Sequence, residues 1–134
     1  MENIQNIMVC VTQQRTCERL IRRGAQIRDE HRGELFVIHV AKEGDHFLGK
    51  SEDGDALEYL FEKAKAYGAT LTVVRSQDVL ETLKKLTEKN SIDLIVVGQS
   101  YENEEKNVTT KLEKKLPKGV VVETVPVEQK EKVS

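Results

Sequence analysis

Residues 92–100 read Ile-Asp-Leu-Ile-Val-Val-Gly-Gln-Ser, and this segment decides the fold class. Its apolar run, rich in Val and Ile, is typical of a strand that is buried on both faces of a parallel sheet. The run stops at Gly98, where polar residues begin. Because glycine has no Cβ, backbone or a ligand can come close at that end of the strand. In open α/β sheets, ligands bind beyond the carboxyl ends of the strands, where the strand order reverses. The segment therefore predicts both a fold class and the place to look for a site.

Strand-like and helix-like patterns alternate along the whole chain. Four segments with helical periodicity separate the strand-like runs, and this alternation predicts an α/β fold with right-handed crossovers. We expect one doubly wound, five-stranded parallel sheet with helices on both faces. The domain is expected to cover residues 1–127, and residues 128–134 are expected to form a polar tail. The five expected strands are residues 7–11, 35–40, 71–74, 92–98 and 119–125.

Single residues mark how the helices should begin, end and pack. Gly24 lies on the apolar face of the first helical segment, so this helix should lie close to the sheet. Gly68 follows the second helical pattern and is a typical C-terminal cap. Asp78, with Glu81 three residues later, resembles a capping box at the start of the third helix.

The charge balance excludes several classes of partner. The 134 residues carry 21 Lys and Arg against 23 Asp and Glu, so generic binding to nucleic acid or to a membrane surface is not expected. No apolar run approaches the roughly 20 residues of a membrane span, and the N-terminus lacks the pattern of a signal peptide. The two cysteines, Cys10 and Cys17, are expected to be reduced structural thiols. We therefore expect a cytoplasmic protein.

Residues 44–51, Gly-Asp-His-Phe-Leu-Gly-Lys-Ser, match the phosphate-binding pattern G-x-x-x-x-G-K-S. In that motif the loop starts at the end of a strand, whereas residues 41–43 intervene here. Asp53 and Asp55 follow the motif, and their carboxylates would crowd the helix N-terminus that must hold the phosphates. We expect a chance match, and we keep a P-loop ATP hydrolase that uses Gly44–Ser51 as an alternative.

The titratable residues do not form a recognisable catalytic pattern. His31, His39 and His46 have no second ligand at a spacing that suits a metal, and none is expected. His39 is interpreted as a packed strand residue. Asp93 stands at the amino end of its strand, which is the wrong end for chemistry in this fold class. We therefore expect that the protein is not an enzyme.

Polar residues gather where the first and fourth strands should end side by side. Their hydroxyls, amides and backbone N–H groups suit neutral oxygens and phosphate oxygens, but not acid–base chemistry. They either line a ligand site or only cap helices and turns. The candidates are Thr12, Gln13, Gly98, Gln99 and Ser100 at the strand ends, and Asn107, Val108 and Thr109 at the start of the last helix.

These segments, taken in order, resemble the universal stress protein family. The resemblance covers about residues 4–127. Residues 18–25, which follow the first strand, are most similar to the stress-protein-like domain of Kdp-type potassium sensor histidine kinases. Residues 35–40, 78–81 and 94–100 also match segments of the family in the right order. The resemblance implies the strand order 3-2-1-4-5, frequent homodimers and, in one branch, ATP or AMP in the crevice.

The resemblance also places single residues. Val40 matches the position on the adenine side of the second strand, and Gly98 matches the first glycine of the nucleotide motif. Tyr101 stands at the second glycine position, and Lys106-Asn107 stands where glycine and serine are expected. The sensor-kinase branch similarly lacks these glycines, and some of its members are regulated through cyclic di-AMP. A nucleotide at this site, if one binds, is therefore expected to be ATP, AMP or cyclic di-AMP.

The expected function is a non-catalytic regulatory or stress-response domain that senses an adenine nucleotide between the first and fourth strands. The alternative is a ligand-free protein-interaction module of the same fold, for example one that signals with a sensor kinase. Gly98→Val is expected to fill the ligand's space. A homodimer is expected through the edge of the fifth strand, at residues of about 119–127, and Val122→Lys or Val125→Lys is expected to yield monomers.

Overall fold

A computed structural model describes residues 4–12, 14–49, 52–98 and 111–126. Five parallel strands form one sheet in the order β3-β2-β1-β4-β5. The fold class and the strand order expected from the sequence are thus confirmed. The strands are β1 (Asn6–Cys10), β2 (Glu34–Lys42), β3 (Thr70–Ser76), β4 (Leu94–Gly98) and β5 (Val121–Val125).

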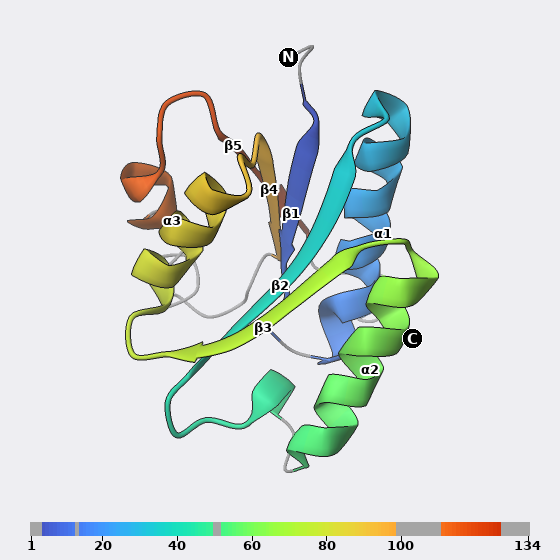
Figure 1. Cartoon of the computed structure of the whole chain (residues 1–134), viewed down its shortest axis with the longest axis vertical. Coiled ribbons are helices and arrows are strands. Elements are labelled where there is room, and N and C mark those ends of the chain that lie inside the picture. The colour runs from blue at the N-terminus through green and yellow to red at the C-terminus, as the bar shows by residue number, and fades with distance from the viewer. Residues whose placement is uncertain (1–3, 13, 50–51, 99–110, 127–134) are drawn as a thin grey trace.

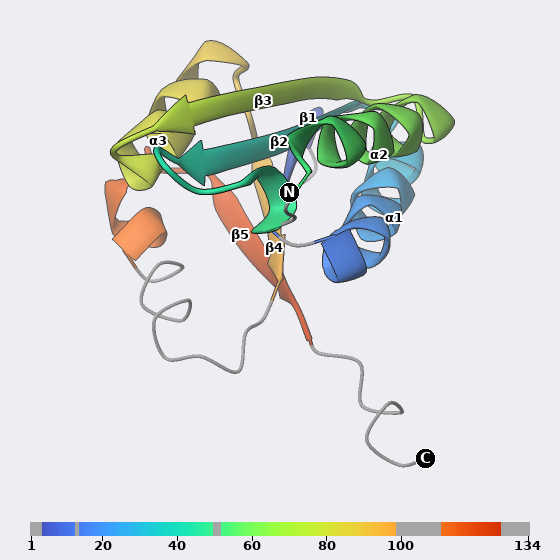
Figure 2. The same cartoon turned by 90° about the horizontal axis from the view of Figure 1, so that it is seen from below.

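Helices cover both faces of this sheet (Figure 1). Helices α1 (Gln14–His31) and α2 (Asp53–Ala66) lie on one face, and α3 (Val79–Lys89) lies on the other. A helical segment over residues 111–115 lies on the α3 side, where Leu112 is buried. Figure 2 shows the sheet between these two layers. Each face has its own aliphatic core, and β1 at the centre contributes Val9 to one and Met8 to the other.

Helix α1 packs closely on the sheet because Gly24 has no side chain. A Cβ at this position would lie 2.4 Å from Cγ2 of Val9 and 3.0 Å from Cδ1 of Leu35. Both of those side chains are buried. The interpretation of Gly24 from the sequence is therefore confirmed.

The helix caps also follow the sequence. Asp78 precedes α3, and its Oδ1 accepts a hydrogen bond from the Glu81 amide at 3.0 Å. Gly68 follows α2 with φ of +69°, a conformation that favours glycine. Asp93 has a structural role at the amino edge of the sheet, where it accepts the amides of Gln5 and Asn6 at 2.9 and 3.0 Å.

The strand boundaries differ from the expected ones at the polar ends. β2 continues to Lys42, and β3 continues to Ser76, because these ends pair with each other beyond the apolar runs. β5 begins only at Val121, since Gly119 has φ of +95° and still belongs to the turn after the last helix. Periodicity detects burial, whereas strand length depends on backbone pairing, which polar residues also make.

Candidate functional site

A pocket of about 750 Å³ opens at the carboxyl ends of β1, β2 and β4, on the face that α3 covers. This volume lies in the range of small-molecule sites. Its apolar wall comes from Val40, Val97, Leu80, Leu83 and Leu112, which also belong to or pack on the core beneath α3. Its polar rim comes from the segments that follow β1, β2 and β3, with Thr12, Asp45, His46, Gln77 and Asp78.

Three of the residues expected from the sequence line this pocket. They are Thr12, which is exposed, and Val40 and Gly98, which are half-buried. The structure therefore brings together the ends of β1, β2 and β4, as the strand order requires. The remaining candidates, Gln13, Gln99, Ser100, Asn107, Val108 and Thr109, lie outside the described residues.

Gly98 contributes to the pocket in a different way from the one expected. A Cβ at Gly98 would point to the other face of the sheet, 3.3 Å from Cδ1 of Leu20 on α1. Val97 is its neighbour, and successive side chains of a strand point to opposite faces. The expectation that Gly98→Val fills the ligand's space is therefore wrong, because the new side chain would press on α1. Residues from the α3 face are the right ones to test the pocket.

Sequence reasoning missed most of the residues that the β2 and β3 ends contribute. Lys42 ends β2, and Gly44, Asp45 and Gln77 lie in the segments after β2 and β3; all four line the pocket. Apart from Val40, which the family resemblance implied, the expectation considered the ends of the first and fourth strands, where the strand order reverses, and the start of the last helix. The signal that could have found the others is their position, since all parallel strands end at the same edge of the sheet.

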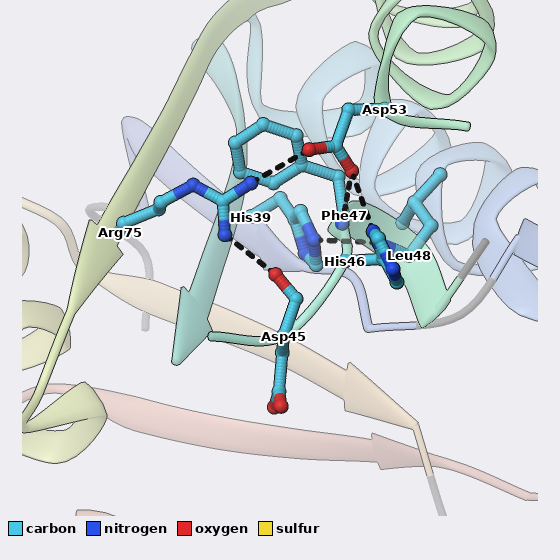
Figure 3. A network of polar contacts seen from close by, with 7 residues as sticks. All are labelled: His39, Asp45, His46, Phe47, Leu48, Asp53 and Arg75. Carbon is cyan, nitrogen blue, oxygen red and sulfur yellow. Dashed lines mark hydrogen bonds and ion pairs between the residues drawn. The ribbon is translucent and has the colours of Figure 1, made fainter. Parts of the chain in front are cut away.

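His39 connects three parts of the site. Its Nδ1 lies 2.8 Å from the carbonyl oxygen of Val11. The amide of Leu48 donates to its Nε2 at 2.9 Å (Figure 3). Because an amide only donates, Nε2 is the acceptor and Nδ1 carries the proton that the Val11 carbonyl accepts. Burial lowers the pKa of His39, the Val11 bond opposes this shift, and the charge of Arg75 adds to it. His39 is thus a neutral, packed residue, as expected, and it has no free nitrogen for acid–base chemistry.

Asp53 holds the loop that forms part of the rim. Its Oδ1 accepts the amide of Phe47 at 3.1 Å, and its Oδ2 pairs with Nη2 of Arg75 at 2.8 Å (Figure 3). The same Arg75 guanidinium lies 4.1 Å from the centre of the Phe47 ring. The Phe47 amide is the main cause that lowers the pKa of Asp53, with Arg75 and His46 adding to the effect. These contacts hold residues 44–49 against the sheet.

The Walker-like segment makes a structure of its own. Only Glu43 separates it from β2, so it is closer to a strand end than its sequence suggests. However, Phe47–Gly49 form a 3-10 turn, in which Leu48 is buried with φ of +55°. The amides of Phe47 and Leu48 are bound to Asp53 and His39, so they are not free to bind phosphate. Lys50 and Ser51 lie outside the described residues.

Three further features bear on function: the thiol in the pocket, possible metal ligands and possible membrane spans. Cys10 lines the pocket, and burial raises the pKa of its thiol to about 12, which keeps it protonated. Over the described ranges, no three His, Cys, Asp or Glu side chains gather in a way that could hold a metal ion. The helices in the same ranges include none that is long and apolar enough to cross a membrane.

Comparison with known proteins identifies the fold that this chain shares with solved structures. No family model and no curated protein sequence matches the chain. Solved structures do match, among them the universal stress protein UspA from Lactobacillus plantarum, with a TM-score of 0.70 and 16% identity over 91% of this chain and 97% of that one. This chain has the universal stress protein fold.

Two other universal stress proteins of this fold are in complex with a nucleotide. One is in complex with cAMP, with a TM-score of 0.66 and 17% identity over 92% of this chain and 97% of that one. The other, from Archaeoglobus fulgidus, is in complex with dAMP, with a TM-score of 0.60 and 19% identity over 88% of this chain and 96% of that one. Adenine nucleotides are therefore ligands of proteins that share this fold.

Proposed function

We propose that the protein is a cytoplasmic, non-catalytic regulatory domain that binds an adenine nucleotide in the pocket at the carboxyl ends of β1, β2 and β4. The observation that carries this proposal is the pocket itself, with an apolar wall large enough for a base and a polar rim. Val40 and Gly98 line it, in agreement with the family's nucleotide positions. The cAMP and dAMP complexes of proteins with this fold support the choice of ligand.

The charge of the site favours a nucleotide with few phosphates. Asp45 and Asp78 lie on the rim against one lysine, Lys42, and the sequence after Gly98 carries Glu102, Glu104 and Glu105. The sequence after Gly98 also lacks the other glycines of the nucleotide motif, which let backbone amides approach a triphosphate. We propose that cAMP or AMP binds more tightly than ATP, because the described rim is net negative and the sequence lacks the later glycines of the nucleotide motif.

The test is a calorimetric titration with cAMP, AMP, ATP and cyclic di-AMP. Leu80→Trp is expected to weaken binding of the preferred nucleotide at least about tenfold, since the indole fills the pocket. Leu57→Trp is the matched control, because Leu57 is 39% exposed on α2 on the other face of the sheet. It should leave the affinity within about twofold. Tight binding should also raise the unfolding free energy, by about 2.7 kcal/mol at a hundredfold excess over Kd.

Different results in these experiments would favour one of the alternative functions. If none of these nucleotides binds wild-type protein, the ligand-free interaction module replaces the proposal. Magnesium-dependent ATP turnover that Lys50→Ala removes would favour the P-loop hydrolase. Tight binding of cyclic di-AMP alone would favour the role of the sensor-kinase domain, which the sequence resembles.

We also propose that two copies pair through the outer edge of β5, as in the expected homodimer. β5 is an edge strand of the sheet, and its Val121 is 52% exposed. The Val121 amide donates to the Asp93 carbonyl at 3.1 Å, towards β4. Since amides alternate along a parallel strand, those of Val122 and Thr124 point to the open side. An open edge with valines is a pairing surface, and a two-fold axis would satisfy both copies.

Thr124→Pro is expected to convert this dimer into a monomer. Proline removes an outward N–H and leaves the bonds to β4 in place. Val122→Lys and Val125→Lys are less specific tests, because both valines are half-buried and pack on the two cores. Light scattering at micromolar concentration measures the mass, with Thr124→Val as the control that keeps the N–H. A monomeric mass for the wild type would contradict the dimer.

A further inference from the structure

A second pocket lies on the opposite face of the sheet, between α1 and the carboxyl end of β5. Its volume is about 250 Å³. Three arginines of α1 line it, Arg19, Arg22 and Arg23, together with Glu123 and Val125 of β5. Arg22 and Arg23 follow Arg19 by three and four positions, so each of them is a neighbour of Arg19 on the helix surface. The formal charge of this lining is two units positive, whereas the whole chain is negative.

Only one of these arginines has a carboxylate partner among the described residues. Nε of Arg23 lies 2.5 Å from Oε2 of Glu123, and its Nη2 lies 3.2 Å from Oε1. This is the two-bond geometry in which a guanidinium binds a carboxylate. Each oxygen of Glu123 therefore accepts a bond from Arg23, and this pairing raises the pKa of that guanidinium.

Arg22 shares the nearest carboxylate of its own helix with two donors from the α2 side. Glu18 lies one turn before it and feels its charge. However, Glu18 already accepts Nζ of Lys63 at 3.1 Å and the hydroxyl of Tyr67 at 3.4 Å, both from the α2 side. Arg22 is exposed and lines the second pocket, and it forms no ion pair at hydrogen-bond distance with a carboxylate of the described residues.

Arg19 has a buried N–H donor without an acceptor among the described residues. Its Nε atom is buried and has no hydrogen-bond partner in the described part of the chain. A buried donor without an acceptor destabilises the folded state, and more so when the group is charged. Such an atom is rare in a folded protein and calls for an acceptor, which the residues that the structure describes do not supply. An oxyanion that draws the guanidinium towards the pocket would supply it.

We propose that the pocket between α1 and β5 binds a phosphate group, as inorganic phosphate or as a small phosphate monoester. Arg19 and Arg22 would hold the oxygens, because a guanidinium matches a phosphate with two parallel hydrogen bonds. Val125 offers an apolar surface beside them for the organic part of a monoester. The site is separate from the nucleotide pocket, which lies under α3, so it does not depend on the proposed nucleotide function.

The test is a titration of the whole protein with inorganic phosphate and with phenyl phosphate at constant ionic strength, followed by backbone and arginine Nε–Hε NMR signals. We expect saturable shifts in α1 and β5, including the Arg19 signal. Arg19→Gln and Arg22→Gln are each expected to weaken binding about tenfold. Lys85→Gln removes the same charge from an exposed position on α3 and should leave the affinity within about twofold. Stronger binding of phenyl phosphate would identify a monoester as the ligand class, and equal binding would identify inorganic phosphate.

Glu123→Gln makes the test specific. It removes the carboxylate that occupies Arg23, so phosphate should bind more tightly, about threefold or more. A purely structural ion pair would give no gain in affinity. The proposal is overturned if wild-type protein shows no saturable shifts, if chloride at equal ionic strength competes as well as phosphate, or if Lys85→Gln weakens binding as much as Arg19→Gln does. Far-UV circular dichroism of each variant verifies that it remains folded.

Discussion

Gly24→Val is expected to lower the free energy of unfolding by about 3 kcal/mol. The new Cβ would lie 2.4 Å from Cγ2 of Val9, which is fully buried in the centre of the sheet. Val9 is β-branched and packed, so it cannot turn away without disturbing its neighbours. The helix would have to move off the sheet, and the buried stripe of α1 would lose contacts with β1 and β2.

Urea unfolding measures this loss, and Gly54→Val is the matched control. Gly54 lies in the first turn of α2, and a Cβ there would meet no atom within 4 Å. The same substitution should therefore change stability by less than about 0.5 kcal/mol at this exposed position. Equal stability of the two variants would contradict the close packing of α1. Since α1 carries the arginines of the second pocket, the variant should also lose that site.

His39→Phe is expected to lower the free energy of unfolding by about 2–4 kcal/mol, even though phenylalanine has a similar ring. The substitution leaves the Val11 carbonyl and the Leu48 amide without their partner, and His39 is only 4% exposed. The loop that forms part of the nucleotide pocket would lose its bond to the sheet.

His46→Phe is the control in the same loop, because this side chain is 59% exposed. Its effect should stay below about 0.5 kcal/mol. If both variants were equally stable, His39 would not be the structural connection described above.

The same residue predicts how stability depends on pH. Burial lowers the pKa of His39 below its ordinary value of 6.5. The unfolded chain therefore binds this proton at a higher pH than the folded protein does. The stability contributed by neutral His39 is present above pH 6.5 and is lost as the pH falls from there through the lower pKa of the folded state. Urea unfolding between pH 7.5 and 5 should show the gap between wild type and His39→Phe becoming smaller as the pH falls. A gap that does not change with pH would contradict the shift.

The layered α/β fold could be predicted from local patterns. The apolar run that ends at Gly98, the glycine on the buried face of α1 and the Asp78 cap each reflect a local physical requirement, and each is found in the structure as expected. Burial patterns and caps depend on neighbours a few residues away, so they are visible in one sequence. The likeness to universal stress proteins further implied the strand order, which the sheet confirms.

Only the tertiary structure could decide which side chains share a pocket. It placed the Val97 side chain on the wall next to Gly98, added further residues from the ends of β2 and β3 to the rim, and set Arg19, Arg22 and Arg23 beside Glu123, about 100 residues away in the chain. These outcomes depend on which face each strand residue takes and on how far backbone pairing continues past an apolar run. Both are set by contacts between distant segments, whose geometry does not appear in the spacing of residues along the chain.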